Sequence, residues 1–364
     1  MTDSATRLVI EPIEVPASLA ADHRGVIRAI ERIGNAVAVH DAGTTDLDDT
    51  AEEILPMWQD RTDHERYGFT AALDGEIVGV GILMMPTDGQ QTVDLDVWVD
   101  PPRWGQGVEE ALLEVVEDEA AQRGRTVLQT YTLHRPDTPG PRRESPTGYG
   151  SIPADDRQTR FHAENGYVLG QVERNSAFDL RGSYDGVERL LDAAQATAGA
   201  GYRLHTWSIP TPEHLLEGFA RCRARLTTDM PAGELLIEQE TWDADRVRRR
   251  EERFAAQGMI VSVAAVEHVP SGELVAYNDI GILTSAPDGP THQFGTLVID
   301  EHRGHRLGMV VKSANLLRWR SIAPRSTRIS TFNAEENTHM LAINTAIGFV
   351  PVSYAGIWKK VLDA

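Results

Sequence analysis

The sequence predicts an α/β (α+β) fold built from two tandem domains. The first observation is the length of 364 residues, because chains beyond about 250 residues usually divide into domains. The second is an internal repeat, since residues 92–116 and 294–314 both read as a strand, a glycine-containing turn and a helix. The third is a composition with 41% hydrophobic and 25% charged residues, typical of globular proteins. We expect domains at residues 1–182 and 202–364, joined by an alanine- and glycine-rich linker at 183–201.

The first copy can be followed element by element. A strand at residues 7–13 precedes helical segments and a hairpin that turns at residues 73–76. Alternating apolar residues at 93, 95, 97 and 99 predict the next strand. Apolar residues at 108, 111, 112, 115 and 116 then lie on one face of a helix. A strand at 126–133, a helix, and a strand opened by Gly166 and Tyr167 complete the copy.

The second copy repeats this order. It begins with a strand at residues 202–209, has a hairpin turning at 269–273, and continues with a strand at 294–299. A helix from 307, a strand at 327–332, another helix, and a strand opened by Gly348 and Phe349 follow. The offset between the copies falls from 199 residues at Trp104 and Arg303 to 182 at Gly166 and Gly348, so the first copy holds 17 extra residues. We expect these in a long loop within residues 134–158, where proline and glycine are frequent.

Charge separates the two copies. The net charge is −20; residues 204–364 carry 19 acidic and 17 basic side chains, so residues 1–203 hold a net charge of −18. This excess of negative charge in residues 1–203 disfavours nucleic acid and anionic membranes as partners and would attract a cationic ligand. The simpler alternative is that these carboxylates only form a solvated acidic surface. The arginines at 246–253 alternate with Glu251 and Glu252, which predicts a solvated helix face.

Several classes of protein are disfavoured by the remaining composition. The single cysteine, Cys222, cannot form an internal disulfide or a cysteine metal cluster. No apolar run approaches the roughly 18 residues of a membrane span, and the N-terminus has no signal-peptide pattern. We therefore expect a cytoplasmic protein, monomeric or homodimeric, without a metal.

The turn before the repeated helix differs between the copies. A helix start presents unpaired backbone N–H groups and the positive end of the helix dipole, which together favour an anion such as phosphate. In the second copy the turn at residues 303–308 reads Arg-Gly-His-Arg-Leu-Gly. In the first copy it reads Trp-Gly-Gln-Gly-Val-Glu at 104–109, and the carboxylates of Glu109 and Glu110 would repel a phosphate. An anionic ligand is therefore expected in the second domain.

This pattern resembles the GNAT superfamily of acyl-CoA-dependent N-acyltransferases, whose motif is Val-x-x-x-x-[Arg/Gln]-x-x-Gly-x-[Gly/Ala]. Val298, Arg303 and Gly308 match the motif, whereas Arg306 stands at its middle glycine. The second domain follows the pattern more closely than the first. The resemblance implies, for each domain, a mixed, mostly antiparallel central sheet flanked by helices, with a V-shaped splay between strands four and five. It also implies acetyl-CoA as the co-substrate, bound in the splay between the strands ending near Ile299 and Phe332.

The resemblance further implies which residues hold acetyl-CoA. Backbone groups would pair with the pantetheine arm at Leu297, Val298 and Ile299. Backbone N–H groups would hold the diphosphate at Gly304, His305, Arg306, Leu307, Gly308 and Met309. Arg303, Arg306 and Lys312 could add positive charge. Asn333 and Asn337 could bond the arm or nearby backbone, or else cap the following helix.

The catalytic groups are less clear from the sequence. Acyl transfer to an amine needs a base for the amine and a proton for the departing thiolate. Many family members use a tyrosine four residues before the glycine-aromatic pair as the proton donor; Asn344 stands there in the second domain and His162 in the first. Asn344 can donate a hydrogen bond but cannot supply a proton. His292, six residues before Val298, is a candidate base with a structural role as the alternative. Asp279 is another, unless it pairs with an arginine.

These observations predict an enzyme that moves an acetyl group from acetyl-CoA to a primary amine of a small, cationic acceptor, by direct attack in a ternary complex. The first domain, which offers Asp94 and Asp96 beside a poor phosphate turn, would be a degenerate copy. The alternative is a non-catalytic acyl-CoA-binding or sensing protein.

Overall fold

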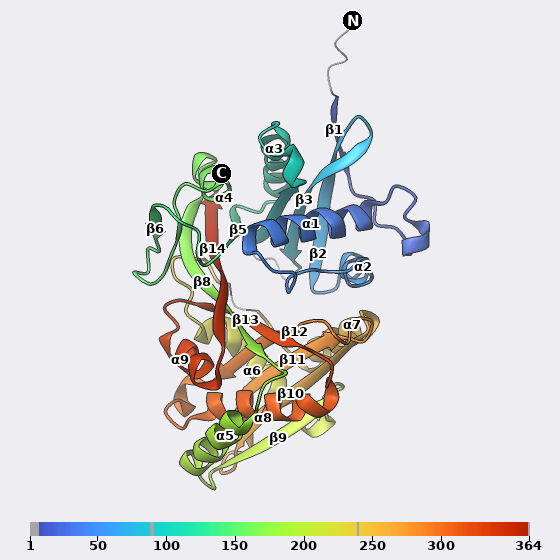
Figure 1. The fold of residues 1–364 in the computed structure, drawn as a ribbon. Coiled ribbons are helices and arrows are strands. Elements are labelled where there is room, and N and C mark those ends of the chain that lie inside the picture. The colour runs from blue at the N-terminus through green and yellow to red at the C-terminus, as the bar shows by residue number, and fades with distance from the viewer. Residues whose placement is uncertain (1–6, 88–90, 239, 363–364) are drawn as a thin grey trace, which may run out of the picture. The chain divides into compact units, whose positions relative to one another are not determined.

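The protein is described by a computed structural model that covers residues 7–87, 91–238 and 240–362. It divides into two compact units (Figure 1). Unit 1 comprises Met1–Val172, Gly233–Leu236 and Ser353–Ala364, and unit 2 comprises Glu173–Ala232 and Ile237–Val352. The predicted division into two α/β domains is therefore present, but each unit is assembled from more than one stretch of the chain.

The first copy contains the elements that the periodicity predicts. Its strands are β1 (Leu8–Pro12), β2 (His64–Leu73), β3 (Glu76–Pro86), β4 (Thr92–Val99), β5 (Val127–His134), β6 (Arg142–Glu144), β7 (Ser151–Pro153) and β8 (Val168–Asp179). Its α-helices are α1 (Val26–Ala42), α2 (Ala51–Gln59), α3 (Val108–Gln122) and α4 (Arg157–Glu164), with 3-10 turns at Leu19–Ala21 and Pro101–Arg103. The expected long loop at 134–158 contains the short β6–β7 pair, and is thus more ordered than the sequence indicated.

The second copy repeats the order. Its strands are β9 (Tyr202–Ser208), β10 (Met259–His268), β11 (Glu273–Leu283), β12 (Thr291–Val298), β13 (Arg328–Ala334) and β14 (Val350–Val361). Its helices are α5 (Asp185–Ala198), α6 (Glu213–Asp229), α7 (Ala244–Ala256), α8 (Leu307–Ile322) and α9 (Thr338–Ile347), with a 3-10 turn at Asp300–His302. In the part of the chain that the structure describes, no helix combines the length and apolar character of a membrane crossing.

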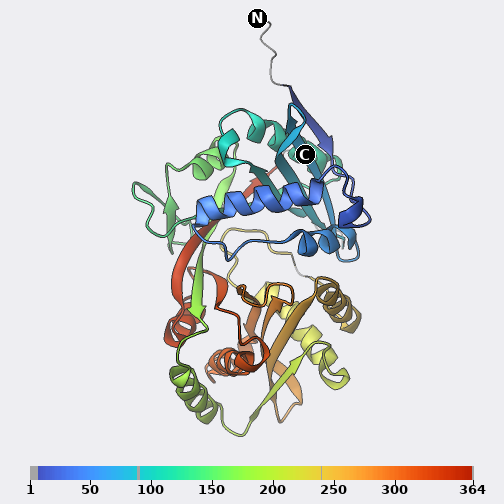
Figure 2. The ribbon, with the colours of Figure 1, turned by 45° about the vertical axis from the view of Figure 1, so that its right-hand side comes forward.

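Unit 1 is a sheet between two layers of helices. Its strand order is β1-β2-β3-β4-β5-β14-β8; β4 and β5 are parallel, whereas β1 to β4 and the pair β5 and β14 are antiparallel. Alternate residues of β3 face opposite layers, as strand geometry requires. Val80 and Ile82 pack in the cluster that includes α1 and α2, and Gly79 and Gly81 approach Leu112 and Val116 of α3. Figure 2 shows α1 crossing the strands of this unit.

Unit 2 has the same layered plan. Its strand order is β8-β13-β12-β11-β10-β9, in which only β12 and β13 are parallel. On β10, Val261 and Val263 pack in the cluster formed with α6 and α7. Ala264 and Val266 point to the other face and pack in the cluster with α5 and α8. The candidate site lies where β12 leads into α8.

The domain boundaries differ from those predicted at residues 182 and 202. Residues 173–179 of β8 pair with β13 in unit 2, and residues 354–361 of β14 pair with β5 in unit 1. Each copy therefore supplies its last strand, in part, to the unit built mainly from the other copy. The predicted linker at 183–201 is also wrong as a linker, because α5 packs against α8 and buries Val187 and Ala194 in the core of unit 2.

Candidate functional site

The start of α8 is shaped by two residues in the left-handed backbone region. β12 ends at Val298, a 3-10 turn follows at Asp300–His302, and Gly304 and Arg306 then adopt φ values of +86° and +57°. Arg306 is the N-cap residue and its side chain makes no cap hydrogen bond. Among the described residues, no side chain accepts a hydrogen bond from the N–H groups of 304–309. These donors and the positive helix end are therefore available to an anion.

Gly308 lies in the first turn of this helix, where α9 comes close. A Cβ atom built on Gly308 would lie 2.9 Å from Cδ1 of Ile343. A side chain at this position would thus have to displace α9 or turn toward the helix start. The absence of a side chain keeps the first turn of α8 bare.

The predicted splay between the fourth and fifth strands is present in unit 2. β12 and β13 pair only at Thr291 with Ile329 and at His292 with Ser330. Beyond these pairs, β12 continues alongside β11 alone, with Leu297 opposite Tyr277 and Val298 opposite Ala276. The edge of residues 297–299 that faces away from β11 is therefore the edge expected to pair with the pantetheine arm.

The predicted positive charges at this helix start differ in placement. Arg306 and His305 are exposed, and the ring of His305 lies 5.1 Å from that of Tyr202. Arg303 is exposed but engaged, since it pairs with Asp300 at 2.5 Å and donates to the carbonyl of Asp229. Lys312 was predicted to add charge to the phosphates, and this is wrong, because its side chain is 1% exposed and points into the core.

The three asparagines take distinct roles. Asn337 is the N-cap of α9, with its side chain accepting a hydrogen bond from the N–H of Met340, so the helix-cap alternative holds for this residue. Asn333 accepts a hydrogen bond of 2.7 Å from the side chain of Asn344. Asn344 is 2% exposed, and its Oδ1 is buried without a hydrogen-bond partner in the described structure.

The two candidate bases are unequal. Asp279 is fully buried; its Oδ2 accepts a hydrogen bond of 2.7 Å from Arg250 and lies 3.6 Å from Nη1 of Arg223. The alternative that Asp279 pairs with an arginine therefore holds. The expected solvated face at 246–253 is correspondingly wrong for Arg250, which is buried in this pair, and for Arg246 and Glu251, which are also buried. His292 is half-buried at the last paired position before the splay.

The matching turn of unit 1 is filled by the protein itself. An offset of 199 residues aligns Glu109 with Gly308, and the Glu109 carboxylate accepts a hydrogen bond from the N–H of Gly105. Arg157 pairs with Glu109 at 2.5 Å and with Asp41 at 3.2 Å, and its guanidinium lies 3.7 Å from the ring centre of Trp104. The expectation that carboxylates occupy this helix start is confirmed for Glu109.

The remaining residues that the sequence singled out in unit 1 do not form a comparable site. Asp94 and Asp96 lie on β4, beside the filled turn. His162, the counterpart of Asn344, donates a hydrogen bond of 2.8 Å from Nδ1 to the carbonyl of Gln158 and stacks on Trp358. Burial lowers the pKa of His162 to about 4, which is typical of a core histidine.

The structure gives Lys312 surroundings that the sequence analysis did not predict. Lys312 Nζ donates a hydrogen bond of 2.7 Å to Oε1 of Gln293, and the Gln293 amide donates one of 2.7 Å to Oγ1 of Thr331. Burial alone lowers the pKa of Lys312 to about 7. The same offset of 199 aligns Leu113 of the first copy with Lys312. This alignment of a lysine with a leucine was the signal that could have revealed the burial of Lys312.

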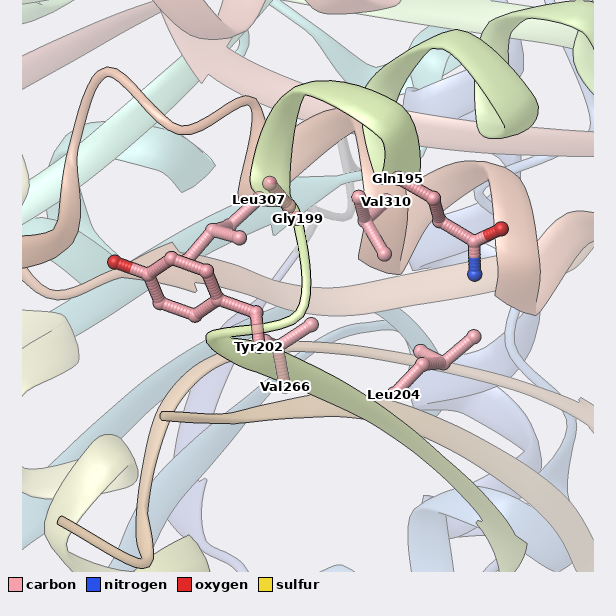
Figure 3. A pocket seen from close by; sticks show the side chains of 8 residues that line it. Gln195, Gly199, Tyr202, Leu204, Val266, Leu307 and Val310 are labelled. Atoms are coloured by element: carbon pink, nitrogen blue, oxygen red, sulfur yellow. The ribbon is translucent and has the colours of Figure 1, made fainter. Parts of the chain in front are cut away.

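Unit 2 also contains a small cavity behind the first turn of α8. It measures about 110 Å³ and is lined by residues of α5, β9, β10 and α8, among them Gln195, Tyr202, Leu204, Leu307 and Val310. Figure 3 shows Leu307 and Val310 projecting toward Val266 and Leu204. It is far too small for a nucleotide, so it is distinct from the helix start that suits a diphosphate.

Comparison with protein families gives one match. Residues 37–139 match the model of the Acetyltransferase (GNAT) family. The match covers strands β2 to β5 and α3 of the first copy, so it does not support the expectation that the second copy is closer to the family pattern. That expectation rested on the diphosphate turn, whereas the matched range spans the sheet and helix framework. No curated protein matches the sequence significantly.

Solved structures share the fold of the whole chain. A tandem GNAT protein from the clavulanic acid biosynthesis pathway aligns with a TM-score of 0.74 and 22% identity, over 98% of this chain and 99% of that one. A GCN5-related N-acetyltransferase from Sphaerobacter thermophilus aligns with a TM-score of 0.64 and 13% identity, over 98% and 96%. The chain therefore has the tandem GNAT fold, and its first unit carries the sequence pattern of the family.

Proposed function

We propose that unit 2 binds acetyl-CoA and that the protein transfers the acetyl group to a primary amine of a small acceptor. The observation that carries this proposal is the bare start of α8. Gly304 and Arg306 turn the chain, Gly308 has no side chain, and no described side chain accepts from the N–H groups of 304–309. A diphosphate matches this arrangement in charge and in hydrogen-bonding capacity.

The rest of the cofactor would follow β12 into the splay. The free edge of residues 297–299 offers backbone groups to the amides of the pantetheine arm, as an added strand would use them. Arg306 is exposed and has no recorded partner among the described residues, so it is the better placed of the two arginines to pair with a phosphate. Arg303 would first have to leave Asp300.

For the chemistry, we infer direct attack of the amine on the thioester in a ternary complex. The amine must lose its proton before or during attack. His292 is the candidate for this step, since the Asp279 carboxylate is paired with the guanidinium of Arg250. Asn344 could hold a carbonyl or amide group by hydrogen bonding, but the proton for the thiolate must come from another group.

The acceptor is proposed to be cationic. This rests on the net charge of −18 in residues 1–203, because a field of one sign raises the local concentration of oppositely charged ligands. Polyamines, amino sugars and aminoglycoside-like compounds fit this description. Equal single-turnover rates with cationic and neutral amines at low salt would remove the steering argument.

A second candidate is a non-catalytic acyl-CoA-binding protein. Two observations favour it: Asp279 is held in a buried ion pair, and Asn344 has no proton to give. The cofactor-binding geometry would be the same under both proposals.

The two candidates are separated by one pair of measurements. Calorimetric titration of coenzyme A into the intact protein tests the binding site, and absence of saturable heat would end both proposals. Release of free thiol from acetyl-CoA is then followed with a panel of primary amines. Binding without thiol release from any amine favours the non-catalytic protein, whereas release with one class of amine identifies the acceptor.

A further inference from the structure

Lys312 lies in the second turn of α8 and is one of the most buried side chains of unit 2, with 1% exposure. In the described part of the chain, its Nζ has a single hydrogen-bond partner, Oε1 of Gln293, and lies 5.0 Å from the ring centre of Phe349. No carboxylate is recorded in contact with it. A buried ammonium without a counter-charge is strongly unfavourable, so its presence calls for an explanation.

The fold does not require a lysine here. The corresponding position of α3 is Leu113, which is 4% exposed and packs in the core of unit 1. An apolar side chain therefore satisfies the same helix-on-sheet packing in the sister copy. The lysine in unit 2 therefore carries an energetic cost of burial that an apolar side chain at this position would avoid.

The position of Lys312 coincides with the closed end of the splay. Gln293 is the first residue of β12 beyond its last pair with β13, and its amide bridges to Thr331 on β13. Thr331 and Asn333 lie on the same face of β13 because strand side chains alternate, and Asn333 is bonded to Asn344 of α9. Lys312, Thr331 and Asn344 thus gather on the helix side of the splay.

This place is where an acyl-CoA bound as proposed would end. Its diphosphate lies at the start of α8 and its arm pairs with residues 297–299, so the arm leads along β12 toward Gln293. The four residues from Leu297 to Gln293 span about 13 Å at strand rise. The sulfur at the end of the arm therefore comes to the end of the splay that Lys312 lines.

We propose that Lys312 is the proton donor to the sulfur of coenzyme A when the thioester bond breaks. The acceptor nitrogen forms a bond with the carbonyl carbon, the carbon–sulfur bond breaks, and its electron pair goes to sulfur. A proton passes from the Lys312 ammonium to sulfur, giving the thiol and a neutral amine. The proton released by the acceptor nitrogen leaves through His292 or solvent and restores the ammonium. Gln293 is a positioning residue, since it orients the Lys312 amine.

The chemistry suits this role. Burial lowers the pKa of Lys312 to about 7, with no charged neighbour contributing. An alkyl thiol has a pKa of about 8.5, so proton transfer from this ammonium to the thiolate is favourable. This supplies the proton that Asn344 cannot.

The test measures the ionisation of the coenzyme A thiol while it is bound to the protein, and it rests on the proposed function. The ultraviolet absorbance of the thiolate is followed against pH, after calorimetry has shown saturable binding. We expect the thiol of bound coenzyme A to have a pKa about 1 unit below that of free coenzyme A, because an ammonium within about 6 Å stabilises the thiolate. In Lys312→Met the pKa should return toward the free value while binding persists.

The outcomes are distinguishable. Absence of coenzyme A binding contradicts the proposed function. Binding with a thiol pKa equal to that of free coenzyme A in the wild-type protein overturns the role of Lys312, even if every variant fails to fold. A lowered pKa that survives in Lys312→Met, or in Lys312→Leu, also overturns it. Lys359→Met is the matched control, because Lys359 lies on β14 in unit 1 and should leave the bound thiol unchanged.

Discussion

Helices α3 and α8 begin at equivalent positions in the two copies, yet three of their residues differ in kind. Gly107, Glu109 and Leu113 of α3 stand where α8 has Arg306, Gly308 and Lys312. Both helices follow a strand, a 3-10 turn and a residue in the left-handed region. In unit 1 the helix start is filled by Glu109 and Arg157, and the core position is apolar. In unit 2 the start is bare and the core position carries an amine.

The difference shows that the same backbone turn can be filled by a carboxylate of the protein itself or left without one. A carboxylate from the first helical turn can use the same N–H donors and the same dipole as an external ligand. Each of the three differences can be exchanged between the units, which gives the following predictions.

The largest expected effect concerns the position of Leu113 and Lys312. Lys312→Met should stabilise the protein below pH 7 by about 5 kcal/mol, since the pKa is lowered from 10.5 to about 7 in the folded state and each unit is about 1.4 kcal/mol. Between these two values the unfolded lysine holds a proton that the folded one has released, so wild-type stability rises with pH. The variant's advantage should therefore shrink from pH 7 to pH 10. Urea unfolding midpoints measured across this range check the prediction, with Lys359→Met as control; no advantage at pH 6 would contradict it.

The next effect concerns Glu109 and Gly308. Gly308→Glu should reduce coenzyme A affinity at least about 100-fold, or about 2.7 kcal/mol, because the new carboxylate would occupy the helix start as Glu109 does. Gly308→Ala distinguishes the effect of the negative charge from the effect of steric crowding. Its Cβ would lie 2.9 Å from Cδ1 of Ile343, but it adds no charge. Calorimetry should show a much smaller loss for the alanine variant. Equal losses for both would mean that displacement of α9, and not the carboxylate, blocks binding.

A smaller effect is expected when the Glu109 side chain itself is changed in unit 1. Glu109→Gln should lower stability by about 1–3 kcal/mol, because the partly buried Arg157 loses one of its two carboxylates. A double-mutant cycle with Arg157→Gln, measured by urea unfolding, isolates the coupling between the two side chains. Additive losses would show that Glu109 does not hold Arg157 over Trp104.

The smallest effect concerns Gly107 and Arg306. Arg306→Gly should raise the stability of unit 2 by about 1 kcal/mol, because arginine is strained at a φ of +57°. The same change should weaken coenzyme A binding by about fivefold, since it removes an exposed charge near the diphosphate. The temperature of thermal unfolding should thus rise, while the affinity for coenzyme A measured by calorimetry should fall. Arg303→Ala, at a residue already paired with Asp300, should change binding less.

Much of the fold was predictable because it is local. Alternation and helical periodicity identified the strands and helices around residues 92–116 and 294–317, and the offset of 199 aligned their turns. The hairpin at residues 73–76 was predicted from Asp74 and Gly75, which both adopt positive φ. The exchange of β8 and β14 was not predictable in this way, because periodicity shows that a segment is a strand but not which strand it pairs with.

The candidate site was predicted in outline and missed in detail. Glycines and arginines at 303–308 are recognisable from sequence because their roles depend on backbone conformation and charge. Asp279 and Lys312 depend on what surrounds them in three dimensions. Lys312 was expected to add charge beside the diphosphate turn, because charged side chains are usually accessible. The contact of Asp279 with Arg250, 29 positions earlier in the chain, has no sequence periodicity that would reveal it.

The course of β8 and β14 has a consequence for how the chain can be divided. A cut near residue 200 would leave one fragment carrying residues 173–179, which belong to the sheet of the other, and a second carrying residues 354–361, which belong to the sheet of the first. Neither piece would contain a complete sheet, so each should be insoluble when produced by itself. Produced together, the pieces should complement one another. Each half of the chain therefore depends on the other to complete its fold.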